Sequence, residues 1–252
     1  MKIGVIGAGR LGICFALLAE SAGHDVYVSD VRPNYVDQIN AREIFSNEPD
    51  VEELLMESKH LRATTNNQDV IKSSDVIFTF VPTPSLDDGS YDCSLVDSVV
   101  CDLLRAPNLE GKKFIVGCTT NPGFVDKVDE KLEGRGISVF YSPEFVAQGT
   151  IIRDMKNADM ILCGGRDDEG FELIKSIYLS FMDSEVNFYP MSNTAAEITK
   201  IGINCFLTYK ISYANMMGQI LYNSGCGDEI KNILASIGAD SRIGSKYLNY
   251  GL

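Results

Sequence analysis

The chain has 252 residues, of which 45% are hydrophobic, so it can bury the core of one large domain or of a domain and a half. Its 22 basic and 35 acidic side chains give a net charge of −13, which argues against nucleic acid or an anionic membrane as a partner. No apolar run has the length of a membrane span, and the N-terminus lacks the charged start of a signal peptide, so we expect a cytoplasmic protein.

The number and spacing of the cysteines and histidines argue against disulfides and against a metal site. Seven cysteines, an odd number, lie scattered along the chain without a CxxC pair, and His24 and His60 are the two histidines. This pattern favours neither a disulfide framework nor a zinc site. We therefore expect no metal ion.

The N-terminal segment has the pattern of a nucleotide-binding turn. Residues 2–6 are an apolar run typical of a buried parallel strand, and the sequence Gly7-Ala8-Gly9-Arg10-Leu11-Gly12 follows directly. Gly7 permits a tight turn, Gly9 lets the backbone approach a pyrophosphate, and Gly12 lets the next helix pack closely on the strand. We expect Gly7, Gly9, Arg10, Leu11 and Gly12 of this turn to contact a dinucleotide.

The residues that follow the turn indicate which dinucleotide is bound. A helix over residues 11–22 would point its free N–H groups at the phosphates. A strand over residues 26–29 then ends at Asp30, whose carboxylate suits the ribose hydroxyls of NAD and would repel the extra phosphate of NADP. Arg32, two residues further on, is able to hold a phosphate and is the one feature that favours NADP. The sequence predicts NAD.

Helices and strands continue to alternate after Asp30, which predicts the α/β class with a Rossmann-type, doubly wound, mainly parallel sheet. The strand over residues 76–81 ends in the loop Val81-Pro82-Thr83-Pro84, at the sheet edge where such folds bind ligands. The remaining predicted helices cover residues 34–41, 51–58, 67–72, 95–105, 125–133 and 169–181, and the remaining strands cover residues 113–118, 138–141, 160–163 and 185–189.

A long helix is predicted over residues 194–223, opened by a capping box of Thr194 and Glu197. It would be roughly 45 Å long, a length that favours packing against a second subunit, so we expect a homodimer through this helix. A further helix over residues 228–237 and a tail follow. We expect a dinucleotide-binding domain at residues 1–190 and a helical dimerisation domain at residues 191–252.

Four polar residues are candidates for chemistry. Thr119 and Glu144 follow strand ends, Lys200 lies in the first turns of the long helix, and Asn204 is four residues beyond it on the same face. A buried lysine can stabilise a developing alkoxide, and a carboxylate can orient water or accept a proton. Taken singly, each of these residues is more often a surface charge or a helix cap.

Taken together, the motifs resemble the UDP-glucose/GDP-mannose dehydrogenase family, and the resemblance spans the whole chain. The motifs are, in chain order, GAGRLG with Asp30, VPTP at residues 81–84, CTTNPG at residues 118–123, SPEFVAQG at residues 142–149, AEITK at residues 196–200 with Asn204, and DSRIG at residues 240–244. Members of that family oxidise the C6 alcohol of a nucleotide-linked hexose to a uronic acid with two NAD, for surface polysaccharide biosynthesis.

The resemblance implies a role for each matching residue. Gly7, Gly9, Gly12 and Asp30 would hold the adenosine half of NAD, and Val81, Thr83, Pro84 and Thr119 would line the dinucleotide. Glu144 matches a glutamate that handles water in thioester hydrolysis. Lys200 and Asn204 match the pair that steadies the oxyanion, and Arg242 matches an arginine that contacts the nucleotide sugar.

The chain also departs from the family pattern. The family's nucleophilic cysteine follows the position of Gly251, where this sequence ends at Leu252, and neither Cys118 nor Cys205 matches it. The C-terminal nucleotide-sugar-binding domain is likewise missing from the 252 residues. We therefore expect a truncated form that binds NAD and turns over nucleotide sugars negligibly.

Two smaller departures from the family pattern concern the affinity for the cofactor. Tyr35 stands where many members carry a basic residue, and Gln148 where many carry glutamate.

Two other functions remain open. One alternative is a short β-hydroxyacid dehydrogenase, which needs no cysteine and shares the glycine turn, the long helix and the lysine–asparagine spacing. The other is a non-catalytic NAD-binding dimer, which the missing nucleophile favours and the retained Glu144, Lys200 and Asn204 disfavour.

Overall fold

The computed structural model of the protein describes residues 1–251. The chain forms two compact units, Met1–Ile198 and the part from Thr199 onward. The last residue of the predicted dimerisation domain, Leu252, lies outside the described residues.

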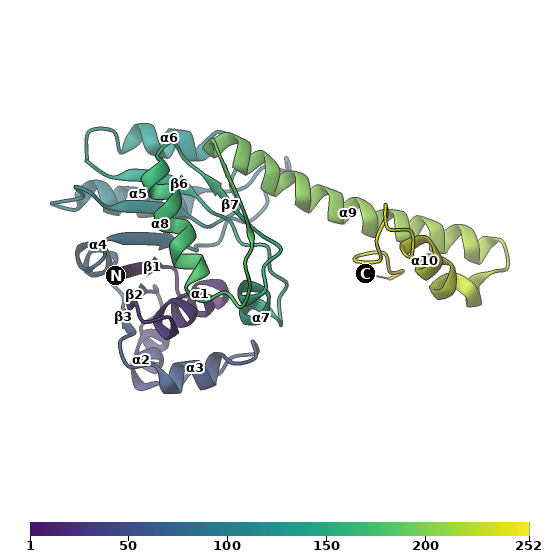
Figure 1. Cartoon of the computed structure of the whole chain (residues 1–252), viewed down its shortest axis with the longest axis horizontal. Helices are drawn as coiled ribbons and strands as arrows, with labels where there is room; N and C mark the ends of the chain where they lie inside the picture. The colour runs from purple at the N-terminus through teal and green to yellow at the C-terminus, as the bar shows by residue number, and fades with distance from the viewer. Residues whose placement is uncertain (252) are drawn as a thin grey trace. The chain divides into compact units, whose positions relative to one another are not determined.

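The first unit is built on one eight-stranded sheet with the strand order β3-β2-β1-β4-β5-β6-β7-β8. Figure 1 labels β1, β2, β3, β6 and β7 of this sheet. The strands are β1 (Lys2–Ile6), β2 (Asp25–Ser29), β3 (Arg62–Thr64), β4 (Val76–Thr79), β5 (Lys113–Val116), β6 (Ser138–Tyr141), β7 (Met160–Gly164) and β8 (Asn187–Met191). All neighbouring strands pair in parallel except β6 and β7, which meet in antiparallel register at Tyr141 and Gly164. The predicted Rossmann-type sheet is confirmed.

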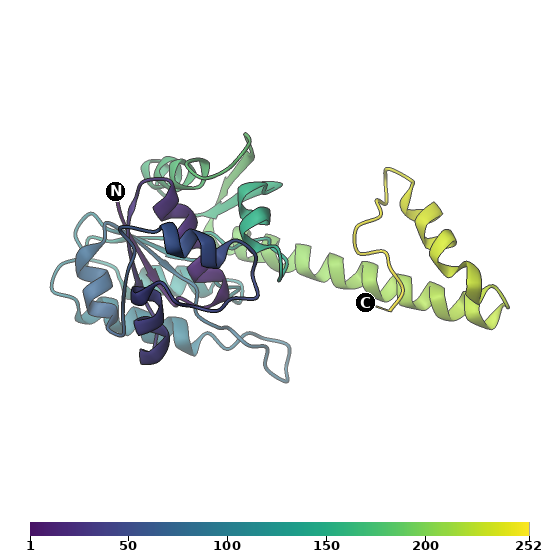
Figure 2. The same cartoon turned by 90° about the horizontal axis from the view of Figure 1, so that it is seen from below.

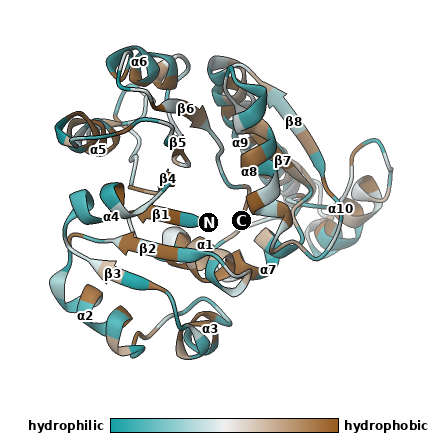
Figure 3. Cartoon of the chain, turned by 60° about the vertical axis from the view of Figure 1, so that its left-hand side comes forward, coloured by the Kyte–Doolittle hydropathy of each residue, from teal (hydrophilic) through white to brown (hydrophobic). Residues whose placement is uncertain are grey.

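Helices cover both faces of this sheet. These helices are α1 (Arg10–Ser21), α2 (Pro33–Ala41), α3 (Val51–Glu57), α4 (Asn67–Ser73), α5 (Ser94–Arg105), α6 (Phe124–Lys131), α7 (Ile151–Lys156) and α8 (Asp168–Leu179). The chain then continues into α9 (Asn193–Asn223), the 3₁₀ turn Gly227–Glu229 and α10 (Ile230–Gly238). One apolar cluster joins α1, α3, α7 and α8 to the sheet, and a second joins α4, α5 and α6 to it. Strand β2 carries the colour of hydrophobic residues along part of its length (Figure 3), and its two valines, Val26 and Val28, are fully buried.

The arrangement of the strands creates one functional edge. Strands β2, β1, β4, β5 and β6 are parallel and adjacent in that order, so their carboxyl ends line up. Ligands of doubly wound sheets bind outside the carboxyl ends of the strands. The glycine turn, Asp30 and the loops after β4, β5 and β6 all start from this edge.

Two short elements, β3 and α7, were missing from the prediction, and a third feature was predicted wrongly. The helix α9 begins at Asn193, and the Thr194 hydroxyl donates to Asp126 instead of capping its own helix. The Glu197 carboxylate accepts hydrogen bonds from residues of α6 and the loop before it. The capping-box prediction is therefore wrong, because both side chains make tertiary contacts that outweigh the local ones.

The part of the chain from Thr199 onward consists of most of α9, α10 and the segments after them. The whole of α9 is one continuous helix (Figure 2). Its 31 residues correspond to about 46 Å at the rise of an α-helix. A small apolar core contains Ala214, Leu234 and Leu248. The Lys210 ammonium donates to the carbonyl oxygens of Ile243 and Gly244, which ties the tail to the helix.

Candidate dinucleotide and catalytic site

The glycine turn between β1 and α1 has the backbone shape that the sequence predicts. Gly7 has a φ of +95°, and a Cβ on it would lie 2.7 Å from the carbonyl oxygen of Phe80. A Cβ on Gly12 would overlap the carbonyl oxygen of Gly7. A Cβ on Gly9 would meet no atom within 4 Å, so this glycine faces open space. Two glycines are thus required by the fold, and the third leaves room for a ligand.

The N-terminus of α1 fits an anion. Its N-cap is Gly9, which offers no capping side chain, and the first turn of the helix contains no acidic residue. The N–H groups of a first helical turn and the helix dipole both favour negative charge. A pyrophosphate would therefore find uncapped donors and no competing carboxylate on this turn.

Asp30 follows β2 and is 9% exposed. Its carboxylate Oδ1 accepts hydrogen bonds from Arg32 Nε at 2.8 Å and from the Arg32 backbone N–H at 3.1 Å. Oδ2 accepts one from Arg32 Nη2 at 3.0 Å, and a carboxylate oxygen accepts about two bonds, so a ribose hydroxyl still fits there. Arg32 also stacks over the ring of Tyr35 at 4.1 Å. Arg32, the residue that favours NADP, is thus hydrogen-bonded to Asp30, the residue that favours NAD.

The loops after β4 and β5 lie beside the glycine turn. A Cβ on Gly7 would be 3.2 Å from Val81 Cγ1, so the turn and the loop Val81-Pro82-Thr83-Pro84 are in contact. Cys118, two residues after the end of β5, is buried, and its thiol donates to the carbonyl oxygen of Thr79 in β4. Burial raises the pKa of the Cys118 thiol to about 12, so it stays protonated and is no substitute for a nucleophilic thiolate. Thr119 follows it and is half-buried.

The loop that carries Thr119 is anchored by a residue that we had predicted only as a cap. Glu197 in α9 is fully buried. Its carboxylate accepts hydrogen bonds from the Thr120 hydroxyl at 2.7 Å, the Gly123 N–H at 2.6 Å and the Val125 N–H at 3.0 Å. Burial raises its pKa, although these bonds act in the opposite direction. Glu197 thus joins the first turn of α6 and the Thr119 loop to the start of α9.

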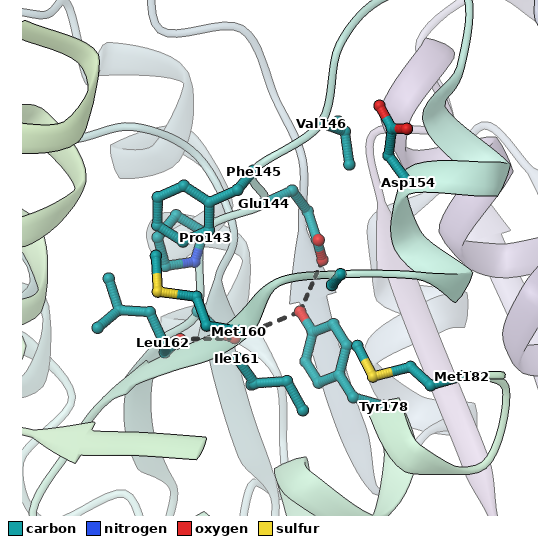
Figure 4. A pocket seen from close by; sticks show the side chains of 12 residues that line it. Pro143, Glu144, Phe145, Val146, Asp154, Met160, Ile161, Leu162, Tyr178 and Met182 are labelled. Atoms are coloured by element: carbon teal, nitrogen blue, oxygen red, sulfur yellow. Dashed lines mark hydrogen bonds between the residues drawn. The ribbon is translucent and has the colours of Figure 1, made fainter. Parts of the chain in front are cut away.

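Glu144 lies in a small pocket beyond the end of β6 (Figure 4). The pocket is formed by Ser142, Pro143, Glu144, Phe145, Val146, Asp154, Ala158, Met160, Ile161, Leu162, Tyr178 and Met182. Glu144 is half-buried, and its Oε1 accepts a hydrogen bond from the hydroxyl of Tyr178 in α8 at 2.7 Å. The arrangement presents a carboxylate at the functional edge of the sheet, held from behind by a buried phenol.

Another buried carboxylate, Glu48, was missed by the sequence reasoning. It accepts hydrogen bonds from the Gly149 N–H at 2.8 and 2.9 Å and from the Ile151 N–H at 3.3 Å, at the N-terminus of α7. Arg10 of the glycine turn lies 3.8 Å from it and donates to Gln148 Oε1 at 2.7 Å. Glu48 and Arg10 therefore connect the glycine turn to the loop after Glu144. In the sequence, Glu48 is one of several acidic residues in a loop, and no local pattern indicates that it makes this connection.

The other predicted site residues belong to the second unit. Lys200 and Asn204 lie one turn apart on α9, and Lys200 is only 8% exposed. Arg242 is exposed in the segment after α10, and its guanidinium forms a two-bond pair with Asp240, at 3.0 and 2.7 Å. This pair repeats the spacing of Asp30 and Arg32.

Comparison with known proteins identifies the family. The NAD binding domain of the UDP-glucose/GDP-mannose dehydrogenase family matches residues 1–182. The chain belongs to this family. The family's central domain matches residues 194–252.

Relatives agree with this assignment. A UDP-glucose 6-dehydrogenase of Haloferax volcanii is 31% identical over 267 residues, which cover 100% of this chain and 61% of the relative. A putative UDP-glucose 6-dehydrogenase of Bacillus subtilis is 30% identical, with 100% of this chain and 59% of the relative covered. The chain thus spans about three fifths of the length of these relatives.

Solved structures of the dehydrogenase family have the same fold. The UDP-glucose dehydrogenase of Pyrobaculum islandicum superposes with a TM-score of 0.89 at 27% identity, over 99% of this chain and 59% of that one. The GDP-mannose dehydrogenase of Pseudomonas aeruginosa, solved as a ternary complex, gives a TM-score of 0.85 at 27% identity, over 94% of this chain and 57% of that one.

NAD is the cofactor of this dehydrogenase family member, and the turn at Gly7, Gly9 and Gly12 fits it. Within residues 1–251, no group of three or more histidine, cysteine or acidic side chains is arranged to hold a metal ion. Across the same residues, every helix is too short or too polar to cross a membrane.

Proposed function

We propose that a protein containing these residues oxidises the C6 alcohol of a UDP- or GDP-linked hexose to the uronic acid, with two NAD consumed per product. The observation that carries the proposal is the common edge of the sheet, where the glycine turn, Asp30, Thr119 and Glu144 follow adjacent parallel strands. Names of the relatives support the substrate class, since they are UDP-glucose 6-dehydrogenases and a GDP-mannose dehydrogenase. The product fits polysaccharide biosynthesis in the cytoplasm, where free thiols stay reduced.

Each group has a distinct task in this proposal. Gly9 and the first turn of α1 bind the pyrophosphate, and the Asp30 carboxylate accepts bonds from the ribose. When bound, NAD supplies the hydride acceptor. Val81, Thr83, Pro84 and Thr119 line its nicotinamide half.

In this proposal the remaining polar residues act at the reacting C6 carbon of the sugar. The Lys200 ammonium and the Asn204 amide stabilise the negative charge that develops on the sugar oxygen. The Glu144 carboxylate orients water and accepts its proton in the step that forms the acid. Arg242 contacts the nucleotide sugar.

We also propose that residues 1–190 form the dinucleotide-binding domain and residues 191–252 a dimerisation domain. The chain from Thr199 onward exposes large apolar side chains on α9, among them Phe206, Tyr209, Met216 and Tyr222, at 61%, 65%, 52% and 71% exposure. Apolar surface of this extent on one helix is typical of a subunit interface. Light scattering tests this: Phe206→Ser with Tyr209→Ser is expected to shift a dimer to a monomer, and an unchanged dimer would refute the interface.

The test of the proposed reaction is NADH formation from a panel of UDP- and GDP-hexoses. In a protein that contains these residues together with the family's cysteine and C-terminal domain, turnover of at least one of these sugars is expected, and Glu144→Gln should lower it about a hundredfold with NAD affinity unchanged. The 252 residues alone are expected to bind NAD with negligible turnover. Glu130→Gln, an exposed glutamate on α6, is the matched control and should keep full activity. Turnover of small hydroxyacids in place of nucleotide sugars would favour the β-hydroxyacid dehydrogenase alternative. NAD binding without any turnover would favour the non-catalytic alternative.

A further inference from the structure

Tyr178 is one of the residues that line the Glu144 pocket. It lies in α8 with only 3% of its surface exposed. Its hydroxyl donates to Glu144 Oε1 at 2.7 Å. The Ser142 hydroxyl lies 3.3 Å from the phenol oxygen and 3.2 Å from the Leu162 carbonyl oxygen. Figure 4 shows the phenol pointing at the carboxylate across the pocket. One phenol thus contacts both polar ends of the turn Ser142-Pro143-Glu144.

The direction of the hydrogen bond follows from the chemistry of the two groups. An ionised carboxylate only accepts, so the phenol must donate. Burial, and after it the negative charge of Glu144, raises the pKa of Tyr178 well above its ordinary value. The phenol therefore stays protonated at neutral pH and remains a donor. A hydrogen bond given to the ionised form of an acid favours that form.

The ring of Tyr178 is held by the aromatic core of the sheet. It makes an edge contact with Phe15 at 5.8 Å between centroids, another with Phe78 at 6.3 Å, and a tilted contact with Phe181 at 5.7 Å. These neighbours come from α1, β4 and the segment after α8. The segment between Ser142 and Gly149, in contrast, has no regular secondary structure. The core therefore holds the Tyr178 phenol in place, and the phenol in turn orients Glu144 in the irregular segment.

We propose that Tyr178 is a positioning residue that holds the Glu144 carboxylate, in its ionised form, at the carboxyl end of β6. The proposal rests on the proposed role of Glu144 with water. A carboxylate has about four acceptor directions, so the bond to Tyr178 occupies one of them and leaves others for further partners. The phenol fixes one oxygen in place, and the orientation of the carboxylate toward water is thereby set before substrate arrives.

Two further titratable groups near this pair, Asp154 and Cys163, have their own partners or stay neutral. Asp154 of α7 also lines the pocket, and its carboxylate accepts from the Thr150 hydroxyl at 2.6 Å and the Ala147 N–H at 3.1 Å. Cys163 of β7 is buried, and burial raises its pKa, so the thiol is uncharged at neutral pH. Glu144 is therefore the group whose titration reports on Tyr178.

The substitution that tests the proposal is Tyr178→Phe, which removes one oxygen and keeps the ring contacts. Its matched control is Tyr141→Phe, since Tyr141 in β6 is equally buried and its hydroxyl lacks a well-formed hydrogen bond. The titration of Glu144 is followed by NMR on the 252-residue protein with ¹³C-labelled glutamate carboxyls, assigned with Glu144→Gln. The midpoint is expected to rise by about one pH unit in Tyr178→Phe and to stay in place in Tyr141→Phe. An unchanged midpoint in folded Tyr178→Phe would overturn the proposal.

Two further readouts separate this proposal from the proposed function. With a nucleotide sugar that the wild-type protein oxidises, Tyr178→Phe should lower kcat about tenfold with the KM for NAD unchanged, and Tyr141→Phe should keep both. A shifted NMR midpoint with unchanged kcat would refute the positioning role. If the protein that carries these residues with the family's cysteine and C-terminal domain oxidises no nucleotide sugar, the proposed function fails, whereas the NMR titration of the 252 residues still decides the contact. If Tyr178→Phe does not fold, Glu144→Asp, which withdraws the carboxylate from the phenol, should lower kcat similarly, and full activity of that variant would count against the proposal.

Discussion

The glycine turn and the Glu144 pocket occupy the same edge of the sheet but are built in different ways. The turn is made by Gly7, Gly9 and Gly12, neighbours in sequence whose lack of side chains defines the shape. The pocket is made by long side chains from separate elements, and its central hydrogen bond joins Glu144 to Tyr178 in α8. The first site depends on backbone conformation and the second on core packing. Substitutions should therefore damage them in different ways.

The largest effect is expected where the backbone leaves no room. In Gly12→Ala the new Cβ would overlap the Gly7 carbonyl oxygen, so we expect a loss of about 3 kcal/mol in the free energy of unfolding. Gly9→Ala is the matched control, because its Cβ would meet no atom within 4 Å, and it should change stability by less than about 0.5 kcal/mol. Urea denaturation measures both. Equal stabilities would show that only a ligand requires Gly12.

The next effect concerns the joint between α6 and α9. Glu197→Ala would leave the Thr120 hydroxyl and the N–H groups of Gly123 and Val125 without their acceptor, which should cost about 2 kcal/mol of stability. Glu130→Ala, on the exposed side of α6, should be near neutral. Thermal unfolding of the two variants compares them, and a small effect of Glu197→Ala would mean that water replaces the carboxylate.

Asp126 and Glu197, two acids where α6 meets the start of α9, should make the stability of the protein depend on pH in opposite directions. Hydrogen bonding, first from Thr194, lowers the pKa of Asp126, so its contribution is complete above the ordinary value of 3.8 and is lost as the pH falls below it. Burial raises the pKa of Glu197, so wild-type stability falls as the pH rises from the ordinary value of 4.5 through the folded value.

Substitution should separate the two contributions. Near neutral pH, Asp126→Asn should be less stable than the wild type, and this difference should shrink in acid. The stability of Glu197→Gln relative to the wild type should instead increase as the pH rises above about 4.5. Urea denaturation between acid and neutral pH measures both profiles. Parallel profiles for the two variants would contradict the assignment.

The smallest effect is on thiol reactivity, which leaves the fold intact. Burial raises the pKa of Cys14 and of Cys118 to about 12, whereas Cys101 and Cys205 are exposed. In the folded protein a disulfide reagent should modify the buried pair at least a hundredfold more slowly than the exposed pair. Mass spectrometry of the modified peptides measures the rates. Fast modification of Cys118 would reopen its candidacy as a nucleophile.

The contrast between the two sites also explains what the sequence could predict. The glycine turn and Asp30 were predicted correctly as local structure because their pattern is contiguous and follows from backbone geometry. The candidate carboxylate Glu144 was found from its place after a strand and from the family pattern. Its role stays a prediction.

The features that escaped prediction depend on contacts between distant segments. Tyr178 was one more apolar position in a predicted helix, because its partner lies 34 residues away in sequence. Glu48 bonds to Gly149 across 101 residues, and Glu197 bonds to Thr120 across 77. The strand β3 and the helix α7 are too short to show a periodicity of their own. Such features follow from packing, which no local pattern records.

The most direct test of the account is a calorimetric titration of the 252-residue protein with NAD, NADP and, for Gly9→Val, NAD again. The account predicts saturable binding of NAD, binding of NADP at least about tenfold weaker because of Asp30, and a similar loss for Gly9→Val without a loss of stability. Absence of NAD binding by the folded protein, or equal NAD affinity in Gly9→Val, would contradict the assignment of the glycine turn as the dinucleotide site.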